Sequence, residues 1–307
     1  MAEGELEQAE ALARRVPGWA SLALTVEPVA IGITNRNYKV TLPDGTAWML
    51  RRPGERTEVL GIDRACEAEA AARADALGIG PPVLGELPGV GTLVTRFVQG
   101  GHIDDPVAFA DRLPAVVALL RRFHASGPIA GRFPIFRVVE WHERDARAHG
   151  VATPARFAAL HERAQEVERA LAAAPTPEVP CHNDLLPANV LFDRDRAWLL
   201  DWEYAGMNDA WFDLGNLAVN AGLDEAAERR LVELYAGAVT PARWARLQLM
   251  KIMSDFREGM WAVVQQGIST LTTIDFAAYA DEHLDRCAEL FASPAFHRWL
   301  ADAASPV

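Results

Sequence analysis

Three oxygen-bearing side chains near the middle of the chain could perform a specific chemistry together. Four residues separate Asp184 from Asn189, and Asp201 follows twelve residues after Asn189, at the end of an apolar run. A carboxylate can accept the proton of an attacking hydroxyl, and amide and carboxylate oxygens are ligands that Mg²⁺ prefers. We therefore predict that Asp184 is a base and that Asn189 and Asp201 hold magnesium, the set that phosphoryl transfer from ATP requires.

A simpler explanation exists for each of these residues. Asp184 could cap a turn, Asn189 could be an ordinary loop residue, and an Asp and an Asn at this spacing often occur by chance. Chance does not also supply the hairpin pattern that follows, with strands expected over 190–193 and 197–201. Pro187 stiffens the loop between the base and the first metal ligand, and His182 is expected to brace it.

Composition narrows the class of protein. The 307 residues are 50% hydrophobic and 23% charged, which predicts a folded chain with a large core. A net charge of -12 disfavours a nucleic-acid partner and is compatible with a cationic substrate. The three cysteines (66, 181 and 287) form no Cys-x-x-Cys pair, which argues against disulfides or structural zinc. The N-terminal residues carry neither a signal-peptide pattern nor a membrane span, so a cytoplasmic enzyme is expected.

Hydrophobic periodicity predicts a small antiparallel sheet followed by a mostly helical region. The expected strands cover 24–29, 38–42, 47–51, 82–84 and 91–97, with a helix over 63–77 that ends at Gly78. Further helices are expected over 106–125 and 154–173, and a long one from Thr240-Pro241 to about residue 266.

These elements predict an α+β, two-lobed fold with a small antiparallel-sheet N-lobe and a larger, mostly helical C-lobe. The order of Asp184, Asn189 and Asp201 resembles that of the protein-kinase motifs, which implies a protein-kinase-like fold. We expect residues 1–97 to form a nucleotide-binding lobe, residues 98–101 a hinge, and residues 102–307 the catalytic and substrate-binding lobe. ATP would lie in the cleft between the lobes.

Four segments resemble the choline/ethanolamine kinase family, within the aminoglycoside-phosphotransferase-like and protein-kinase-like superfamily. They are residues 31–40 (the phosphate-loop turn), 182–189 (the catalytic loop), 201–206 with 212–216 (the metal segment and the turn after it) and 261–269 (the substrate helix). The resemblance extends over roughly residues 25–285.

The resemblance implies an ATP- and Mg²⁺-dependent enzyme and assigns its nucleotide side. Arg51 would hold the phosphates and Glu67 would orient it, with Arg52 and Glu69 as the second choices. The remaining nucleotide-side residues implied are Thr34, Asn35, Asn37, Thr95 and Phe97. Asp213 is implied as an anchor for the catalytic loop, through its backbone and His182.

The acceptor side is implied to hold an ammonium with carboxylates and aromatic faces. The residues implied are Glu203, Tyr204, Glu258 and Trp261, with Phe276 and Tyr279 closing the pocket. Glu258 and Trp261 share one helix face with Gln265. Glu258 stands where the eukaryotic choline kinases have a second Trp, so one wall of the aromatic cage is missing or replaced by charge.

The expected activity is therefore phosphorylation of the hydroxyl of a small amino alcohol, with choline as the leading acceptor or ethanolamine in its place. An aminoglycoside-type antibiotic phosphotransferase is the main alternative, because it would share the catalytic loop. A nucleotide-binding regulatory pseudokinase is the third possibility, and the presence of all the catalytic residues argues against it.

Overall fold

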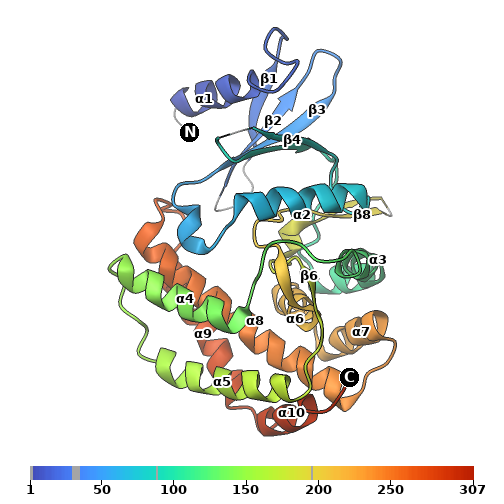
Figure 1. Cartoon of the computed structure of the whole chain (residues 1–307), viewed down its shortest axis with the longest axis vertical. Coiled ribbons are helices and arrows are strands. Elements are labelled where there is room, and N and C mark those ends of the chain that lie inside the picture. Colours follow the sequence, from blue (N-terminus) through green and yellow to red (C-terminus); the bar gives the residue numbers. More distant parts are fainter. Residues whose placement is uncertain (1–2, 30–34, 88, 195) are drawn as a thin grey trace.

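The N-terminal part of the chain forms a five-stranded antiparallel sheet with the strand order β1-β2-β3-β5-β4 (Figure 1). The computed structural model describes residues 3–29, 35–87, 89–194 and 196–307. The strands are β1 (Thr25–Val29), β2 (Asn35–Thr41), β3 (Ala47–Pro53), β4 (Val83–Leu87) and β5 (Thr92–Arg96). All five were predicted, within a few residues of these bounds.

Side-chain alternation gives this sheet two different faces. Tyr38, Leu50 and Val94 are cross-strand partners, all buried in a core that also holds residues of α1 (Glu3–Ala13). One residue along each strand, Asn37 and Arg51 are also partners, on the opposite face. That second face therefore carries the polar residues expected to meet the nucleotide.

Helix α2 (Arg64–Ala76) lies between the sheet and the rest of the molecule (Figure 1). Asp63 caps it by accepting hydrogen bonds from the N–H groups of Ala65 and Cys66. Gly78, with φ 62°, follows the helix as the sequence predicts. The short 3-10 helix η1 (Thr57–Leu60) precedes α2 in the chain.

The remainder of the chain forms the helical lobe around α8 (Pro241–Ile268), which packs against α4, α6, α9 and α10 (Figure 1). The other helices are α3 (Pro106–His124), α4 (Ile135–Ala148), α5 (Phe157–Ala173), α6 (Ala210–Asn220), α7 (Glu225–Ala236), α9 (Phe276–Phe291) and α10 (Phe296–Ala303). Thr240 caps α8 and Pro241 is its first residue, as predicted. The expected helix over 154–173 begins later, at Phe157.

Two short antiparallel strand pairs lie where the helical lobe meets the cleft. They are β6 (Glu178–Cys181) with β9 (Gly206–Asp209), and β7 (Val190–Asp193) with β8 (Arg196–Leu199). The 3-10 helix η2 (Pro187–Asn189) leads directly into β7. The strand expected over 197–201 ends at Leu199, because Asp201 has a left-handed backbone with φ 65° that no strand accommodates.

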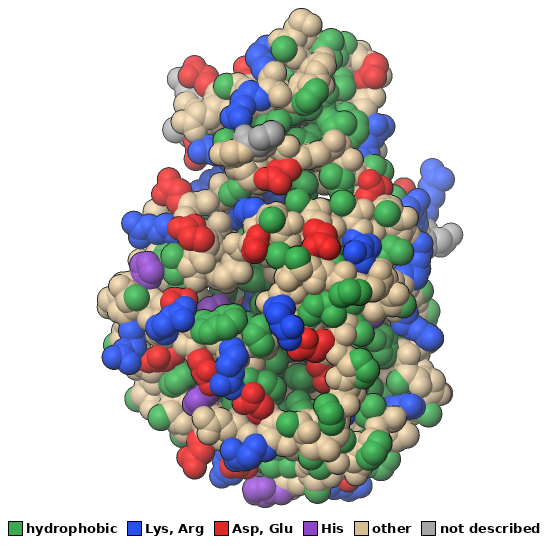
Figure 2. Space-filling view, in the orientation of Figure 1, with side chains coloured by type: hydrophobic (Ala, Val, Ile, Leu, Met, Phe, Trp, Pro, Cys, Tyr) green, Lys and Arg blue, Asp and Glu red, His purple; other side chains and the backbone are tan. Residues whose placement is uncertain are grey.

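Acidic and basic side chains are intermixed over the face of the helical lobe shown in Figure 2. The excess of negative charge is therefore not gathered into one large patch on this face. Among the described residues, no helix has the length and apolar character that a membrane crossing would require.

Residues 98–101, which follow β5, lie directly against β7. Gly101 donates a hydrogen bond to the carbonyl of Phe192 at 3.0 Å and accepts one from its N–H at 2.9 Å. A Cβ on Gly100 would lie 2.6 Å from the Phe192 carbonyl oxygen, whereas a Cβ on Gly101 would meet no atom within 4 Å. Close backbone packing therefore requires glycine at position 100 only.

We expect Gly100→Ala to lower the free energy of unfolding by about 1–3 kcal/mol, because the new methyl group would force two backbone segments apart. Gly101→Ala is the matched control, and it should change this free energy by less than about 1 kcal/mol. Urea denaturation of the two variants and the parent measures both effects. Equal behaviour of the two variants would show that residue 100 does not need to be glycine.

Candidate active site

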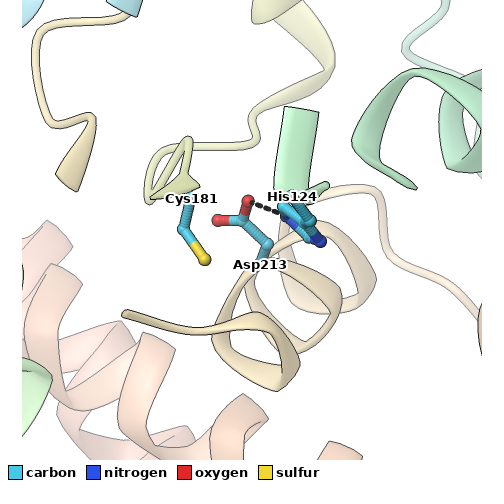
Figure 3. Close-up of side chains that lie close together, drawn as sticks. All are labelled: His124, Cys181 and Asp213. Atoms are coloured by element: carbon cyan, nitrogen blue, oxygen red, sulfur yellow. Dashed lines mark hydrogen bonds and ion pairs between the residues drawn. The ribbon is translucent and has the colours of Figure 1, made fainter. Parts of the chain in front are cut away.

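The catalytic loop between β6 and η2 is held by the buried carboxylate of Asp213, on the first turn of α6 (Figure 3). Asp213 accepts hydrogen bonds from the backbone N–H groups of His182, at 2.8 Å, and Asn183, at 2.7 Å. His124 of α3 lies 3.0 Å from the same carboxylate. These hydrogen bonds hold the loop at two consecutive residues, and Asn183 has a left-handed conformation with φ 65°.

Cys181 lies beside His124 and Asp213, and these three side chains are close enough to suggest a metal site (Figure 3). Both carboxylate oxygens of Asp213 already receive hydrogen bonds from the catalytic loop. Burial also raises the pKa of the Cys181 thiol, which disfavours the thiolate that a metal needs. The cluster therefore supports the loop.

The side chain of Asn183 connects the catalytic loop to the segment that contains the second acidic motif. Its amide nitrogen donates to the carbonyl of Tyr204 at 3.0 Å, and its oxygen accepts from Asn208 at 2.8 Å. His182 makes a further connection, since its Nε2 lies 2.8 Å from the Leu200 carbonyl and its Nδ1 lies 3.3 Å from the Asp184 N–H. Burial lowers the pKa of His182, which favours the neutral ring that can donate at one nitrogen and accept at the other.

Asp184, the expected base, lies between Asn189 and an arginine of α8. Its Oδ2 is 3.3 Å from the amide nitrogen of Asn189, and its Oδ1 is 3.1 Å from Nη1 of Arg257. Burial raises the pKa of Asp184 to about 7, against the lowering effect of Arg257 and together with the negative charges of Glu258 and Glu203. The carboxylate can therefore exchange a proton near neutral pH.

Asp201, the expected second metal ligand, follows β8 and forms an ion pair with Arg51 of the sheet. The Leu200 N–H donates to the carbonyl of Asn189 at 2.9 Å, which holds the two expected ligands in neighbouring segments. Asn189, Asp201 and Arg51 line one cavity between the lobes. The structure thus brings together residues from three separate parts of the sequence.

The expected ion pair between Arg51 and Glu67 is present, with Nη1 and Oε1 3.3 Å apart. Glu69 lies elsewhere, accepting a hydrogen bond from the Ala130 N–H, and Arg52 contacts Gln8. Sequence reasoning missed Arg64, which contacts Glu67 at 2.6 Å from one turn earlier on the helix. Arg64 is the first helical residue after the Asp63 cap, and that position is the only local signal for it.

Glu203, which we expected beside the acceptor, is buried against residues of the sheet and of α2. Its carboxylate is 3.5 Å from Arg51 and 3.4 Å from Arg64, and it accepts a hydrogen bond from Asn35 at 2.8 Å. Arg64 also donates to Thr57 at 2.9 Å. Thr34, another expected phosphate contact, lies outside the described residues.

The cavity between the lobes also contains further residues that were expected on the nucleotide side. Asn37, Thr95 and Phe97 line it together with apolar side chains of both lobes. Trp202 also lines it, and its ring is tilted against that of Phe123 with centroids 4.4 Å apart.

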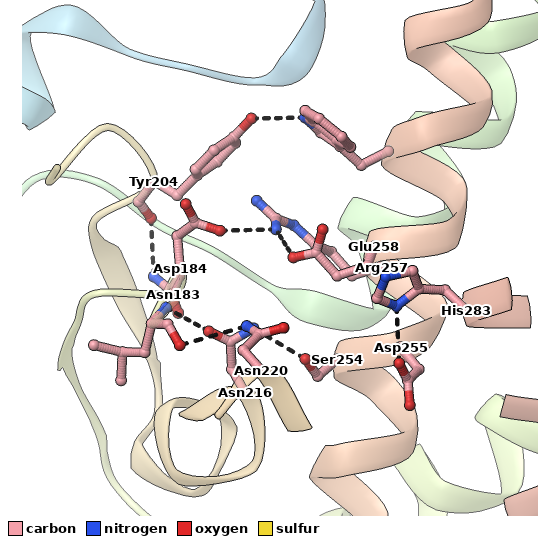
Figure 4. Close-up of polar contacts among 12 residues, drawn as sticks. Asn183, Asp184, Tyr204, Asn216, Asn220, Ser254, Asp255, Arg257, Glu258 and His283 are labelled. Carbon is pink, nitrogen blue, oxygen red and sulfur yellow. Dashed lines mark hydrogen bonds and ion pairs between the residues drawn. The ribbon is translucent and has the colours of Figure 1, made fainter. Parts of the chain in front are cut away.

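Tyr204 and Glu258, both expected at the acceptor, lie near Asp184 and Arg257 (Figure 4). Trp261 donates from its indole nitrogen to the Tyr204 hydroxyl at 3.0 Å, and both residues are buried. The rings of Phe276 and Tyr279 lie edge-on to Trp261, at 5.9 and 6.1 Å between centroids. Glu258 forms an ion pair with its neighbour in the chain, Arg257.

Arg257 is the main site residue that sequence reasoning missed. Its guanidinium contacts both Asp184 and Glu258 through Nη1 and lies 4.3 Å from the ring centroid of Tyr204 (Figure 4). Burial acts to lower the pKa of Arg257, but the carboxylates of Glu258 and Asp184 outweigh it and the net shift is upward. The signal available in the sequence was an Arg-Glu pair directly before the uncharged run of residues 259–264 of α8.

Known proteins resemble this chain in both sequence and fold. The model of the phosphotransferase enzyme family matches residues 25–249. A crystal structure of a choline/ethanolamine kinase family protein from Mesorhizobium loti matches with a TM-score of 0.83 and 32% identity, over 97% of this chain and 98% of that one. The choline kinase LicA of Streptococcus pneumoniae shares the fold, with a TM-score of 0.79 and 21% identity over 93% and 99% of the two chains.

Two further relatives are similar in sequence. Protein LicA of Haemophilus influenzae is 28% identical over 66% of this chain, and the match spans 60% of the length of that protein. Ethanolamine kinase 2 of Mus musculus is 26% identical over 86% of this chain and 75% of its own length.

We expect Asp213→Asn to lower the free energy of unfolding by about 2–4 kcal/mol, because an amide offers one acceptor oxygen where two buried N–H groups need partners. Asp193→Asn is a suitable control, since Asp193 is exposed at the end of β7, and it should change this free energy by less than about 0.5 kcal/mol. Urea denaturation monitored by tryptophan fluorescence gives both values. A fully stable Asp213→Asn protein would mean that other contacts hold the loop.

Proposed function

Because this chain belongs to the phosphotransferase enzyme family, and within it to the choline/ethanolamine kinase family, we propose that it transfers the γ-phosphoryl group of ATP to the hydroxyl of a small amino alcohol. Choline and then ethanolamine are the leading acceptors, by analogy with relatives that carry those names. The observation that carries the proposal is that Asn189 and Asp201 line one cavity, with the Asp184 carboxylate 3.3 Å from the amide nitrogen of Asn189. A cytoplasmic location, where ATP is available, is part of the same proposal.

In the proposed reaction the acceptor hydroxyl donates a hydrogen bond to Asp184. The hydroxyl oxygen attacks the γ-phosphorus in line, a new oxygen–phosphorus bond forms, and the bond from that phosphorus to the β–γ bridging oxygen breaks. The proton passes to Asp184 and ADP leaves. Because the pKa of Asp184 is raised to about 7, this carboxylate is a stronger base than an ordinary Asp and can release the proton again at neutral pH.

Asn189 and Asp201 are suited to hold Mg²⁺. The amide nitrogen of Asn189 is engaged by the carbonyl of Asp184 at 2.8 Å, so the amide oxygen is the atom it can offer to a metal. Asp201 adds an anionic oxygen from the neighbouring loop. When bound, magnesium would neutralise charge on the phosphate oxygens.

Arg51 would bind the nucleotide phosphates, oriented by Glu67, while Asn35, Asn37, Thr95, Phe97 and Thr34 complete the proposed nucleotide side. The ion pair between Arg51 and Asp201 fits this role. When a metal cation binds Asp201, Arg51 is released and can form an ion pair with a phosphate instead. Residues 98–101 are the proposed hinge between the two lobes.

Tyr204, Trp261 and Glu258 are the proposed acceptor-binding residues. The indole and phenol rings form an apolar wall that excludes water from the reacting oxygen, and Glu258 supplies a negative charge for an ammonium group. Glu203 is the fourth proposed acceptor residue; its ion pairs with Arg51 and Arg64 fix its carboxylate, and its negative charge acts on Asp184.

Replacing the base should separate chemistry from binding. We expect Asp184→Asn to lower kcat by about 100-fold or more, since the amide cannot accept the hydroxyl proton, while ATP still binds. Asp193→Asn is again the control and should retain full turnover. ADP release with choline, ethanolamine, related amino alcohols and an aminoglycoside panel gives the rates, and fluorescence titration gives ATP binding.

Turnover with an amino alcohol that is lost in Asp184→Asn supports the proposal. Turnover with aminoglycosides alone would overturn the acceptor class, and near-normal turnover in Asp184→Asn would remove this residue from the role of base.

The raised pKa of Asp184 predicts a pH dependence with a definite sign. Protonated Asp184 cannot accept a proton, so kcat/KM for the acceptor should fall as the pH drops below about 7. The negative charge of Glu258 contributes to raising this pKa, so Glu258→Gln should lower the pKa of Asp184. The fall in kcat/KM should then occur at lower pH in this variant. If kcat/KM falls at the same pH in the parent and in Glu258→Gln, the two carboxylates are not electrostatically coupled.

A further inference from the structure

Arg257 has two N–H donors that no other described residue satisfies. Its Nη1 contacts Asp184 and Glu258, whereas Nε and Nη2 have no hydrogen-bond partner. The residue is only 1% exposed, so these donors are also shielded from water. Buried N–H groups of a charged side chain are costly to leave unpaired, and such groups commonly mark the place of a ligand.

The two unpaired donors lie on the same edge of the guanidinium group. Nε and Nη2 point to one side and form the planar fork that binds both oxygens of a carboxylate, or two oxygens of a phosphate. A quaternary ammonium has no group that could accept these hydrogen bonds. The donor set therefore requires acceptor oxygens from the ligand, and a carboxylate can satisfy both nitrogens at once.

The position of Arg257 places this fork on the acceptor side of the base. The amide nitrogen of Asn189 contacts Oδ2 of Asp184, whereas Nη1 of Arg257 contacts Oδ1. The arginine and the expected metal ligand therefore contact different oxygens of the Asp184 carboxylate. The path from Asp184 Oδ1 to an anion bound by the fork crosses one hydrogen bond, the guanidinium group and a second hydrogen bond. The two oxygens are therefore at most roughly 8 Å apart. The hydroxyl and the anionic group of the acceptor would thus be only a few bonds apart.

The guanidinium also occupies an aromatic face that a substrate cation would otherwise use. It lies 4.3 Å from the centroid of the Tyr204 ring, within the range of a cation–π contact (Figure 4). Asp184, Glu258 and Arg257 carry two negative charges and one positive charge when ionised. The net negative charge of this cluster favours the ammonium group of an acceptor, while the fork of Arg257 offers a separate, directed place for a carboxylate.

We propose that Arg257 determines acceptor specificity by binding a carboxylate of the acceptor through Nε and Nη2. The substrate class is then a zwitterionic amino alcohol, with a hydroxyl, an ammonium and a carboxylate within a few bonds of one another. This inference rests on the proposed function and narrows the choice of acceptor within it.

Matched pairs of acceptors that differ by a carboxylate test the inference directly. Serine is compared with ethanolamine and carnitine with choline, measuring kcat/KM with ATP and Mg²⁺ for the parent, Arg257→Lys and Arg286→Lys. Lysine keeps a positive charge beside Asp184 and Glu258 but removes the planar fork. Arg286 contacts Asp255 of α8 at 2.7 Å and is the control for the same chemical change near the same helix.

We expect the parent to prefer the carboxylated member of at least one pair by about tenfold or more, because a site built to donate hydrogen bonds discriminates against a ligand that cannot accept them. Arg257→Lys should abolish this preference and Arg286→Lys should retain it. Equal use of both members of each pair by the parent would overturn the inference and leave the amino-alcohol kinase intact. A raised KM for ATP in Arg257→Lys with an unchanged preference would also overturn it, by assigning the fork to a nucleotide phosphate.

Calorimetric titration of serine and carnitine into the nucleotide-free protein provides a readout that does not depend on turnover. Binding that is lost in Arg257→Lys supports the anion site, whether or not any of the four acceptors is phosphorylated. Absence of phosphorylation with all four acceptors would count separately, against the proposed function. Binding that is the same in the parent and in Arg257→Lys, or absent from both, would overturn the inference.

Discussion

The buried carboxylate of Asp213 is the interaction on which the active-site geometry depends. A carboxylate with no exposed surface is stable only if hydrogen bonds replace its water, and the N–H groups of His182 and Asn183 provide them. The first turn of α6 adds a favourable electrostatic environment. Because the loop is held at these two residues, Asn183 takes a left-handed conformation and Asp184 follows in a fixed position. The Asn183 side chain then extends the same anchor to the carbonyl of Tyr204.

On the nucleotide side, charges from both lobes are already paired before any ligand binds. Arg51 and Arg64 face the carboxylates of Glu67, Asp201 and Glu203, so the cluster has more negative than positive charge when ionised. A polyphosphate alone would leave these carboxylates to compete with it for the arginines. A polyphosphate that arrives with a divalent cation avoids this conflict, because the cation can replace Arg51 at Asp201. The pairing pattern therefore favours a nucleotide–metal complex over a bare nucleotide.

The parts of this arrangement that local sequence determines were predictable. Side-chain alternation gave the five-stranded sheet, and the spacing of Asp184, Asn189 and Asp201 indicated that these residues lie close together, with Asn189 and Asp201 in one cavity and Asp184 beside Asn189. Glu203 was expected at the acceptor because it follows Asp201 in the chain, but its position is set by arginines on β3 and α2, far away in sequence. The strands β6 and β9 have four residues each, too few for a periodic signal. Arg257 was missed because helical periodicity gives no reason to expect a fully buried arginine.

Arg257 also gives a physical reason for the departure at Glu258, where the eukaryotic choline kinases have a tryptophan. A glutamate placed alone beside Asp184 would put two buried carboxylates close together, and one of them would have to remain protonated. The guanidinium next to it in the chain contacts both carboxylates and removes this conflict, so the Arg-Glu pair acts as one unit. The exchange of an aromatic wall for an ion pair changes what the pocket can recognise. An aromatic cage binds a cation through its charge and shape, whereas a fixed guanidinium beside a carboxylate discriminates through directed hydrogen bonds. Shared chemistry at Asp184 is therefore compatible with a different acceptor.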